Sequence, residues 1–318
     1  MKHLYKILTV VLGILFLFYF KHLFEELPKI NFHEILSEVN YFYVAFSLLA
    51  YLFSHVIRAI RIVVLMGRQD YSLWKLIYMQ FYTNGINLIL PFKLGEVYRV
   101  IEFNKLIKDS NRLLLTIITE KTLDLLLLFI WALLAILFLG QQIAVLQLVV
   151  WILMALIASS LVILFVLPEN IRSINVFLAK RYNSRWVVNV LAFSDKIASV
   201  IANIKLTLKG NASTILLLTF AIWFFEMLGF TYLLPFMAEK SQVWLLSILV
   251  FLSSLIPSVS MGLGGLQLSF SALNYGTVQF NSLVISLTYQ AFIFSPAVLL
   301  GLLLHLYMIT KKKHAVLA

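Results

Sequence analysis

The sequence predicts an all-α integral membrane protein with six transmembrane helices and two re-entrant hairpins in an inverted repeat. Three observations predict this fold: the composition, the lengths of the apolar stretches, and the positions of the basic residues. Of the 318 residues, 62% are hydrophobic and 12% are charged, whereas soluble globular proteins have about 45–50% apolar and about 25% charged residues. This composition excludes a soluble enzyme, a disordered chain and a nucleic-acid-binding protein, despite the net charge of +11.

The apolar stretches define the predicted spans. A helix needs about 20 mostly apolar residues to cross about 30 Å of hydrocarbon. Two shorter or interrupted stretches, 73–92 and 242–276, fall below this requirement. No alanine precedes Ala45, so the first span has no Ala-x-Ala cleavage site and is expected to be an uncleaved anchor. The six stretches that meet the requirement are 4–20, 41–57, 113–139, 143–167, 212–236 and 282–309.

The basic residues predict the orientation of the spans, because cytoplasmic connections are enriched in Lys and Arg. Most of the 25 Lys and Arg residues lie before the first span, in loops 58–75, 93–112 and 168–211, or in the C-terminal tail. We therefore expect a multi-pass protein of the plasma (inner) membrane with both termini in the cytoplasm. This orientation requires that the two short stretches enter and leave the membrane on the same side.

The two short stretches also contain residues that interrupt helices. Proline lacks an N–H group and disfavours helix at the preceding residue. Non-helical backbone at membrane depth persists only where it is buried in protein or lines a wet cavity. The residues expected to break the two hairpins are Asn84, Gly85, Pro91, Gly95, Pro257, Gly262, Gly264 and Gly265.

The order of the elements predicts an inverted repeat. Span 41–57 runs inward, a hairpin enters from the cytoplasm, and span 113–139 runs outward. Span 212–236 runs outward, a hairpin enters from outside, and span 282–309 runs inward. Interrupted segments at matching positions of inverted repeats are typical of a transporter's midplane site. The alternative is a polytopic scaffold in which Pro and Gly only kink helices or allow close packing.

We expect a single membrane domain made of five consecutive parts. These are an anchor helix and outer loop (1–40), the first repeat (41–139), a linking helix with a cytoplasmic amphipathic segment (140–211), the inverted second repeat (212–309) and a basic tail (310–318). The amphipathic stripe at 186–204 predicts a helix on the membrane surface or packed on the protein's own helices.

Three ionisable residues open the span 113–139. Glu120 and Asp124 are four residues apart and share a helix face, and Lys121 and Asp124 are three apart and can pair. A charged group near the membrane centre costs about 2.5–3.5 kcal/mol on insertion scales, so it usually faces a cavity or a partner. These residues are expected to contact a headgroup or to brace a hairpin, although acids also favour a helix N-terminus for electrostatic reasons alone.

Further charges adjoin the first hairpin and occupy the second repeat. Arg99 could hold a phosphate with two parallel hydrogen bonds, with Lys93 adding a point charge, or Glu96 and Arg99 could form an ordinary interfacial pair. Glu226 lies about fifteen residues into its span and has no partner there. It is either protonated and bonded to a neighbour, or it senses ions or substrate.

Metal, cofactor and catalytic sites are not expected. The sequence has no cysteine, and its six histidines show no pair at metal-ligand spacing. No constellation of a nucleophile with a base stands out, so we expect that the chain is not an enzyme and uses no cofactor.

Three motifs carry a resemblance to a known family. They are the run from Pro91 to Arg99, the run from Thr119 to Leu126, and the run from Leu255 to Gln267. In this order and spacing they resemble the lysylphosphatidylglycerol synthase/flippase transmembrane-region family over residues 1–310. The positions that match the family's pattern are Pro91, Gly95, Glu96, Arg99, Glu120, Asp124, Pro257, Gly262 and Gly264.

Three positions depart from the family's pattern. Lys121 stands where the family has Arg, which keeps the charge but loses the bidentate fork. Met261 replaces the first glycine of the glycine run. Gln267 stands where an acid is common, which puts a carboxylate role there in doubt.

The resemblance implies translocation of an anionic phospholipid or a polyprenyl-phosphate-linked lipid between leaflets. Because the chain ends at Ala318, we expect no soluble aminoacyl-transfer domain and no synthase step. The expected substrate-binding residues are Lys93, Glu96, Arg99, Glu120, Lys121, Asp124, Glu226 and Gln267.

Two alternatives to translocation remain. One is a non-transporting membrane partner of a lipid- or glycan-modifying enzyme. The other, less favoured, is a membrane-embedded transferase that uses the acids of loop 21–40, which is short for a donor pocket.

Overall fold

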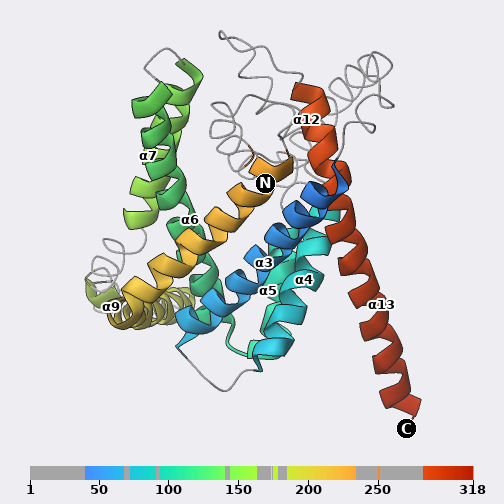
Figure 1. Ribbon diagram of the computed structural model, residues 1–318. Helices are drawn as coiled ribbons and strands as arrows, with labels where there is room; N and C mark the ends of the chain where they lie inside the picture. Colours follow the sequence, from blue (N-terminus) through green and yellow to red (C-terminus); the bar gives the residue numbers. More distant parts are fainter. Residues whose placement is uncertain are drawn as a thin grey trace, which may run out of the picture.

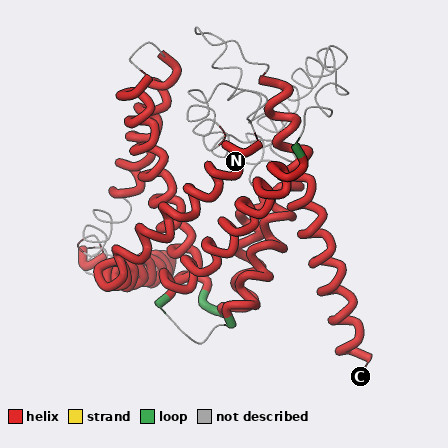
Figure 2. The backbone as a smooth tube through the Cα atoms, in the orientation of Figure 1, coloured by secondary structure: helices red, strands yellow, loops and turns green. Residues whose placement is uncertain are grey.

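The computed structural model describes residues 40–67, 72–90, 94–139, 144–162, 173, 175–177, 185–233, 250 and 282–317. These residues form helices joined by short connections, without a strand among them (Figure 2). The helices are α3 (Tyr41–Met66), α4 (Leu73–Ile89), α5 (Leu94–Ile107), α6 (Ser110–Leu139), α7 (Ala144–Leu161), α9 (Arg185–Leu233), α12 (Ser282–Tyr289), the π-helical turn η4 (Gln290–Phe294) and α13 (Ser295–Leu317).

Three helical segments within the described residues are long and apolar enough to cross a membrane. They are Tyr41–Met66, Gly210–Leu233 and Ser286–Tyr307, and they coincide with predicted spans. The prediction of an all-α membrane protein is therefore confirmed. The total of six spans and the two re-entrant hairpins stay predictions. The predicted anchor 4–20 lies outside the described residues, as does stretch 242–276 except for Val250.

The helix α3 is longer than predicted. It begins after Asn40, whose side-chain oxygen accepts the N–H of Phe42 at 3.0 Å, and it ends at Gly67 in the left-handed conformation (φ 57°). The assignment of Arg58 and Arg61 to a basic loop is wrong, because both lie inside this helix. An apolar run follows them and no helix-ending residue occurs before Gly67, so nothing in the chain stops the helix at residue 57.

The helices α4 and α5 form an antiparallel hairpin. They pack against each other, and α4 rises from the end of the molecule where α3 stops while α5 returns to it (Figure 1). The predicted breaks at Asn84 and Gly85 are wrong, since α4 is continuous from Leu73 to Ile89. It ends at Leu90 (φ −75°, ψ 129°), in the extended conformation that a residue adopts before proline.

The glycines of this hairpin serve close packing and do not break helices. A Cβ atom on Gly85 would lie 2.6 Å from the Cα of Gly301 in α13, so the backbones of α4 and α13 are in contact. Gly95, predicted as a break, lies in the first turn of α5, where a Cβ would collide with Asn87. A helical glycine costs about 1 kcal/mol relative to alanine, which is tolerated here because a larger residue would force the helices apart.

The last span contains a π-helical turn directly before Pro296. Proline cannot donate a backbone hydrogen bond, and the chain adjusts upstream: the N–H of Ser295 donates to the carbonyl of Gln290, five residues earlier. The Ser295 hydroxyl donates to the same carbonyl at 3.0 Å. The distortion next to Pro296 thus takes the form of a π turn, a feature often found at functional sites.

The helix α9 consists of two segments that meet at Asn211, the one residue within it with non-helical angles (φ −129°, ψ 20°). The predicted amphipathic stretch 186–204 belongs to the first segment, which lies across the lower end of the bundle in Figure 1. The second segment packs against α3 and α6. The surface position predicted for the amphipathic stretch stays a prediction.

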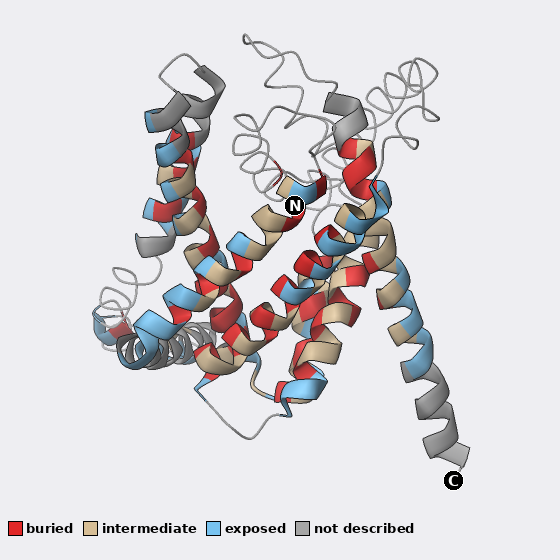
Figure 3. Cartoon of the chain, in the orientation of Figure 1, coloured by how far each residue is buried: buried red, intermediate tan, exposed pale blue. Residues whose placement is uncertain are grey.

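The main hydrophobic core joins α3, α6, α7, α9 and the η4 region. Figure 3 shows buried residues where these helices meet and exposed residues on their outer faces. The exposed faces are themselves apolar, as Phe53, Leu137 and Trp151 illustrate, which suits helices surrounded by lipid. The core residues include Tyr51, Leu128, Leu153, Ile222, Phe230 and Ile293.

The close contact between α4 and α13 generates a prediction. Replacing Gly85 by alanine places a methyl group against the backbone of Gly301, and such overpacking typically destabilises by about 1–3 kcal/mol. We expect the G85A variant to have a lower thermal unfolding temperature than wild type in detergent micelles, followed by intrinsic fluorescence.

The matched control is Gly210→Ala, because nothing lies within 4 Å of a Cβ added at Gly210. This variant is expected to unfold at or slightly above the wild-type temperature. Equal unfolding temperatures for the two variants would contradict the backbone contact.

Candidate functional site

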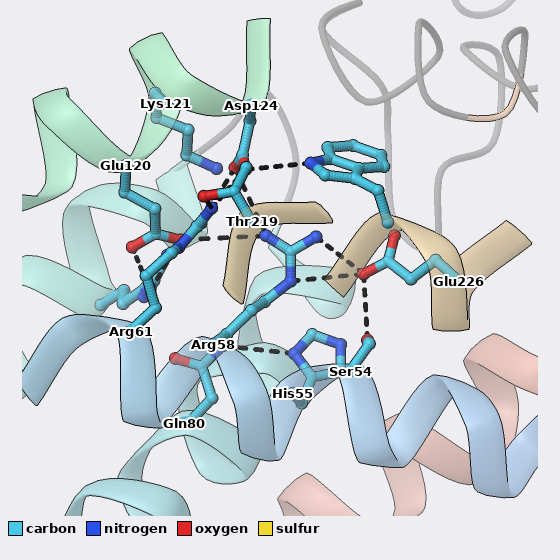
Figure 4. A network of polar contacts seen from close by, with 12 residues as sticks. Ser54, His55, Arg58, Arg61, Gln80, Glu120, Lys121, Asp124, Thr219 and Glu226 are labelled. Carbon is cyan, nitrogen blue, oxygen red and sulfur yellow. Dashed lines mark hydrogen bonds and ion pairs between the residues drawn. The ribbon is translucent and has the colours of Figure 1, made fainter. Parts of the chain in front are cut away.

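A network of charged side chains connects four helices in the interior of the protein. Its members come from α3, α5, α6 and α9, and Figure 4 shows most of them converging on the two arginines of α3. Four are cations and four are carboxylates, so the formal charges of the network balance. The members are Arg58, Arg61, Glu96, Arg99, Glu120, Lys121, Asp124 and Glu226.

The spacing along α3 places its polar residues on one face. Ser54, Arg58 and Arg61 follow each other at intervals of four and three residues, which is one side of a helix. On α6, Glu120 and Asp124 are four residues apart and face these arginines. The site therefore requires only ordinary helices packed side by side.

The ion pairs form a chain of alternating sign, which begins at an exposed lysine. Lys121 Nζ lies 2.8 Å from Glu96 Oε1 on α5. Glu96 Oε2 lies 3.6 Å from Arg99 Nη1, and Arg99 Nη2 lies 3.0 Å from Glu120 Oε2. This part of the chain joins the α4–α5 hairpin to α6.

The chain continues through α3 and ends on α9. Arg61 connects two carboxylates of α6, with Nη2 3.2 Å from Glu120 Oε1 and Nη1 2.8 Å from Asp124 Oδ1. Arg58 then connects Asp124 to Glu226, with Nη1 3.4 Å from Asp124 Oδ2 and Nη2 2.7 Å from Glu226 Oε1. Consecutive pairs thus join Lys121 to Glu226, and each inner member has a partner of opposite charge on both sides.

The side chains at the lysine end of this chain of charges are the most exposed to solvent. The Lys121 side chain is 45% exposed and that of Glu96 is 28% exposed, whereas Arg61 and Glu120 are fully buried. The side chains of Arg58 and Glu226, at the far end, are each 11% exposed. The chain of charges therefore starts at the surface, passes through the interior, and ends at two nearly buried groups.

The energetics of such a network favour a role beyond stability. Desolvating charged groups offsets most of their mutual attraction, and apolar replacements of whole buried networks are often neutral or stabilising. Removal of one partner alone costs about 3–5 kcal/mol, because it leaves an uncompensated buried charge. Eight coupled charges among apolar helices are therefore more simply explained by what they bind than by what they hold together.

The pair of Arg58 and Glu226 has an unusual geometry. Both Nε (3.3 Å) and Nη2 (2.7 Å) of Arg58 donate to the same oxygen, Oε1 of Glu226. The Ser54 hydroxyl lies 3.1 Å from that oxygen and 2.8 Å from the carbonyl of Tyr51, and its single proton is shared between them. The paired N–H donors of an arginine suit two acceptor oxygens, but here both donate to a single oxygen.

Asp124 has a fuller set of partners. Its oxygens accept from Arg61, from Arg58 and from the indole N–H of Trp223 at 3.0 Å. Thr219, one turn before Trp223 on α9, also accepts from Arg61 at 3.0 Å. Asp124 is therefore held by groups from two helices besides its own.

Buried polar groups continue beside the network. Gln80 on α4 lies 3.2 Å from Nδ1 of His55, and Asn84 donates to the hydroxyl of Tyr51 at 3.0 Å. Several buried atoms have no hydrogen-bond partner within the described part of the chain, and they include Nε2 of His55, Oε1 of Gln80, Nε of Arg61 and Nε of Arg99. Native interiors rarely leave such atoms unpaired, so they are expected to meet water or a ligand.

The structure brings most of the predicted site residues together. Glu96, Arg99, Glu120, Lys121, Asp124 and Glu226 belong to one network, whereas Lys93, Pro91, Pro257, Gly262, Gly264, Gly265 and Gln267 lie outside the described residues. The described residues contain no group of three or more His, Asp or Glu placed to hold a metal ion.

Of the two pairings that the sequence suggested, Lys121–Asp124 is replaced by another pair, whereas Glu96–Arg99 is present. Lys121 does not pair with Asp124, because it reaches across to Glu96 on α5 while Asp124 holds the arginines of α3. Glu96 and Arg99 do pair, at 3.6 Å, but Arg99 is buried and lies nearer to Glu120, so their pair is one part of the network.

Arg58 and Arg61 are the network residues that sequence reasoning missed. A charge count treats every arginine as facing water, so it assigns both to a loop as orientation charges. The available signal was their spacing of three residues, continued by the apolar run up to Met66, which places both on one face of a longer helix.

Comparisons with known proteins identify a family and no individual relative. A family model described as "Lysylphosphatidylglycerol synthase TM region" matches residues 6–301, which confirms the resemblance seen in the sequence motifs. No match was found among curated proteins or solved structures.

The position of Arg61 between two carboxylates generates a prediction. Replacing Arg61 by methionine keeps much of its volume but leaves Glu120 and Asp124 with one fewer cation in the interior. We expect a loss of about 3–5 kcal/mol of stability, measured as a lower unfolding temperature and a smaller folded fraction by size-exclusion chromatography in detergent.

The control is Lys105→Met, which removes a cation from a side chain that is 61% exposed and, among the described residues, pairs with Glu102. Because the lysine is in contact with water, this pair is expected to contribute less than the roughly 3–5 kcal/mol of a fully buried one. If the R61M and K105M variants were equally stable, the buried network would not have the arrangement described.

Proposed function

The chain belongs to this lysylphosphatidylglycerol synthase TM-region family, and we propose that it moves an anionic lipid between the two leaflets of the membrane. The lipid is either an anionic phospholipid or a polyprenyl-phosphate-linked intermediate. The observation that carries the proposal is the chain of alternating charges from Lys121 to Glu226, set among helices with apolar outer faces. We propose no chemical step, no metal and no cofactor.

The geometry supports this proposal because a lipid headgroup needs a polar path and its tails need an apolar one. Guanidinium groups bind phosphate oxygens through parallel hydrogen bonds. Arg99, Arg61 and Arg58 succeed one another between the exposed and the nearly buried end of the chain of charges. The exposed apolar faces of the helices leave the tails in the bilayer while the headgroup follows the charges.

An entering phosphate competes with carboxylates that are already present. Arg99 is paired with both Glu120 and Glu96, so a headgroup that binds Arg99 must replace one of them. Glu96 is the weaker partner, because it lies farther away and is more exposed. We propose that Lys121 and Arg99 receive the headgroup first, together with Lys93, which directly precedes α5 in the sequence.

The packing of the helices supports an inverted repeat. The second segment of α9 packs against α3, and the two run in opposite directions (Figure 1). The helix α6 packs against α9, and η4 packs against α3. In an inverted repeat of residues 41–139 and 212–309, α3 corresponds to the second segment of α9, and α6 corresponds to the segment that contains η4. The α6–α9 contact and the η4–α3 contact are then equivalent, as such a repeat requires. We propose six spans, two re-entrant hairpins and both termini in the cytoplasm, in a plasma (inner) membrane.

The test is a leaflet-accessibility assay in proteoliposomes. Fluorescent phosphatidylglycerol and a polyprenyl-phosphate analogue are offered separately, and their exposure to a membrane-impermeant quencher is followed in time. We expect wild type to accelerate the loss of protected signal for at least one lipid. Arg99→Ala is expected to abolish this acceleration, because it interrupts the chain of charges at the hairpin.

The matched control is Arg112→Ala, which removes the same charge near the start of α6, outside the network. This variant is expected to retain the wild-type rate. Folded wild-type protein that accelerates neither lipid would exclude translocation of these two lipids and favour a non-transporting partner of a lipid- or glycan-modifying enzyme.

A further inference from the structure

The balance of charges in the network restricts how an anion can enter it. Among the described residues, its four cations and four carboxylates leave no positive charge in excess. A phosphodiester that joins the network therefore adds one uncompensated negative charge among apolar helices. Such a charge is costly at membrane depth, on the order of 2.5–3.5 kcal/mol on insertion scales. A cation taken up with the headgroup would remove this cost.

Among the network carboxylates, Glu226 depends most on a single cation. Glu120 has arginines on three sides, Asp124 has two arginines and the Trp223 indole, and Glu96 has Lys121 and Arg99. Within the described part of the chain, the cation paired with Glu226 is Arg58, and Ser54 shares its proton with the same oxygen. If Arg58 turns to another anion, Glu226 keeps no cation among the described residues.

Arg58 is well suited to make that exchange. Its Nε and Nη2 both reach for one oxygen of Glu226, so the second acceptor position of the fork is unused. A phosphodiester offers two non-bridging oxygens and can take Nε and Nη2 in parallel. Arg58 can keep its third contact, from Nη1 to Asp124, during the exchange.

Resting on the proposed translocation, we infer that the protein carries an anionic headgroup together with one proton, and that Glu226 is the residue that takes up this proton. The phosphodiester binds Nε and Nη2 of Arg58, and Glu226 loses its cation. A proton from water on the side of entry then binds the Glu226 carboxylate. The phosphodiester brings a charge of −1 and the proton a charge of +1. The network with the headgroup bound therefore has no net charge.

Release reverses these steps on the opposite side of the membrane. The headgroup leaves Arg58, the Glu226 proton passes to water on the side of exit, and the carboxylate returns to Arg58. No bond of the lipid is made or broken. The net process moves one headgroup and one proton in the same direction and carries no net charge.

The other ionisable groups near Glu226 are consistent with this assignment. Arg58 and Tyr51 face it from α3, Tyr289 from the end of α12, and Asp124 and Glu120 lie beyond Arg58 on α6. The two tyrosines are neutral phenols. Both α6 carboxylates keep Arg61 during the exchange, and Asp124 also keeps Nη1 of Arg58, so Glu226 is the group left to accept the proton.

The decisive experiment imposes a pH gradient or a membrane potential on proteoliposomes of the full chain. Fluorescent phosphatidylglycerol, labelled on an acyl chain so that its headgroup is native, is the probe. A gradient of one pH unit is expected to enrich it about tenfold in the leaflet facing the more alkaline side, since one proton moves with each lipid. A potassium diffusion potential at equal pH is expected to leave the distribution unchanged.

The outcomes separate this inference from the proposed translocation. Faster equilibration of the probe with no response to the pH gradient would overturn proton coupling and leave translocation intact. A response to the potential but not to the pH gradient would show that the headgroup crosses as a bare charge, which also overturns the inference. No acceleration at all would overturn both.

A variant assigns the proton to one residue. In Glu226→Gln the side chain cannot gain a proton, so the lipid crosses without one. We expect this variant to lose enrichment by the pH gradient and to respond instead to the membrane potential. The control Glu102→Gln neutralises a carboxylate of α5 that lies outside the network and pairs with Lys105, and it is expected to behave as wild type. If E226Q kept the wild-type response to pH, another group would carry the proton.

Discussion

The arrangement of this protein depends on the neutralisation of Arg61. A guanidinium that is fully buried among apolar helices must have carboxylates on more than one side, and Glu120 and Asp124 of α6 supply them. This requirement sets α3 beside α6. It also draws in α9 through Thr219 and Trp223, and α5 through Arg99, because each carboxylate needs further donors. Four helices thus pack around Arg61 and its carboxylates, a set of charges that no single helix could bury.

The same requirement explains which parts of the site the sequence could predict. Glu120, Asp124 and Glu226 stood out because an acid inside an apolar stretch is costly and needs an explanation. Their partners did not stand out, since Arg58 and Arg61 follow an apolar stretch and look like ordinary orientation charges. Whether an arginine near a helix end faces water or a carboxylate depends on a helix far away in the chain. Local patterns do not contain that information.

The fold likewise has features that the sequence predicts and features that depend on distant parts of the chain. Composition and the lengths of apolar stretches were enough to predict helices and a membrane protein. The glycines were ambiguous, because a glycine in a helix can mark a break or a close approach. At Gly85 the deciding fact is Gly301 on α13, which no spacing within α4 reveals. A proline inside an apolar span indicates a distortion, but the π turn that accommodates Pro296 depends on the Ser295 hydroxyl and the Gln290 carbonyl.

The crossing of Gly85 and Gly301 has a mechanical consequence. Side chains between two helices can change rotamer and absorb a small displacement, but two backbones in direct contact have nothing that can adjust. The α4–α5 hairpin and α13 should therefore shift as a single rigid body. Relative motion then falls at the boundaries of that body with α3 and with α6, and the pairs Arg99–Glu120 and Lys121–Glu96 bridge the second of these. The contact of Gly85 with Gly301 fixes the hairpin against α13, whereas ion pairs connect it to α6 on the opposite side.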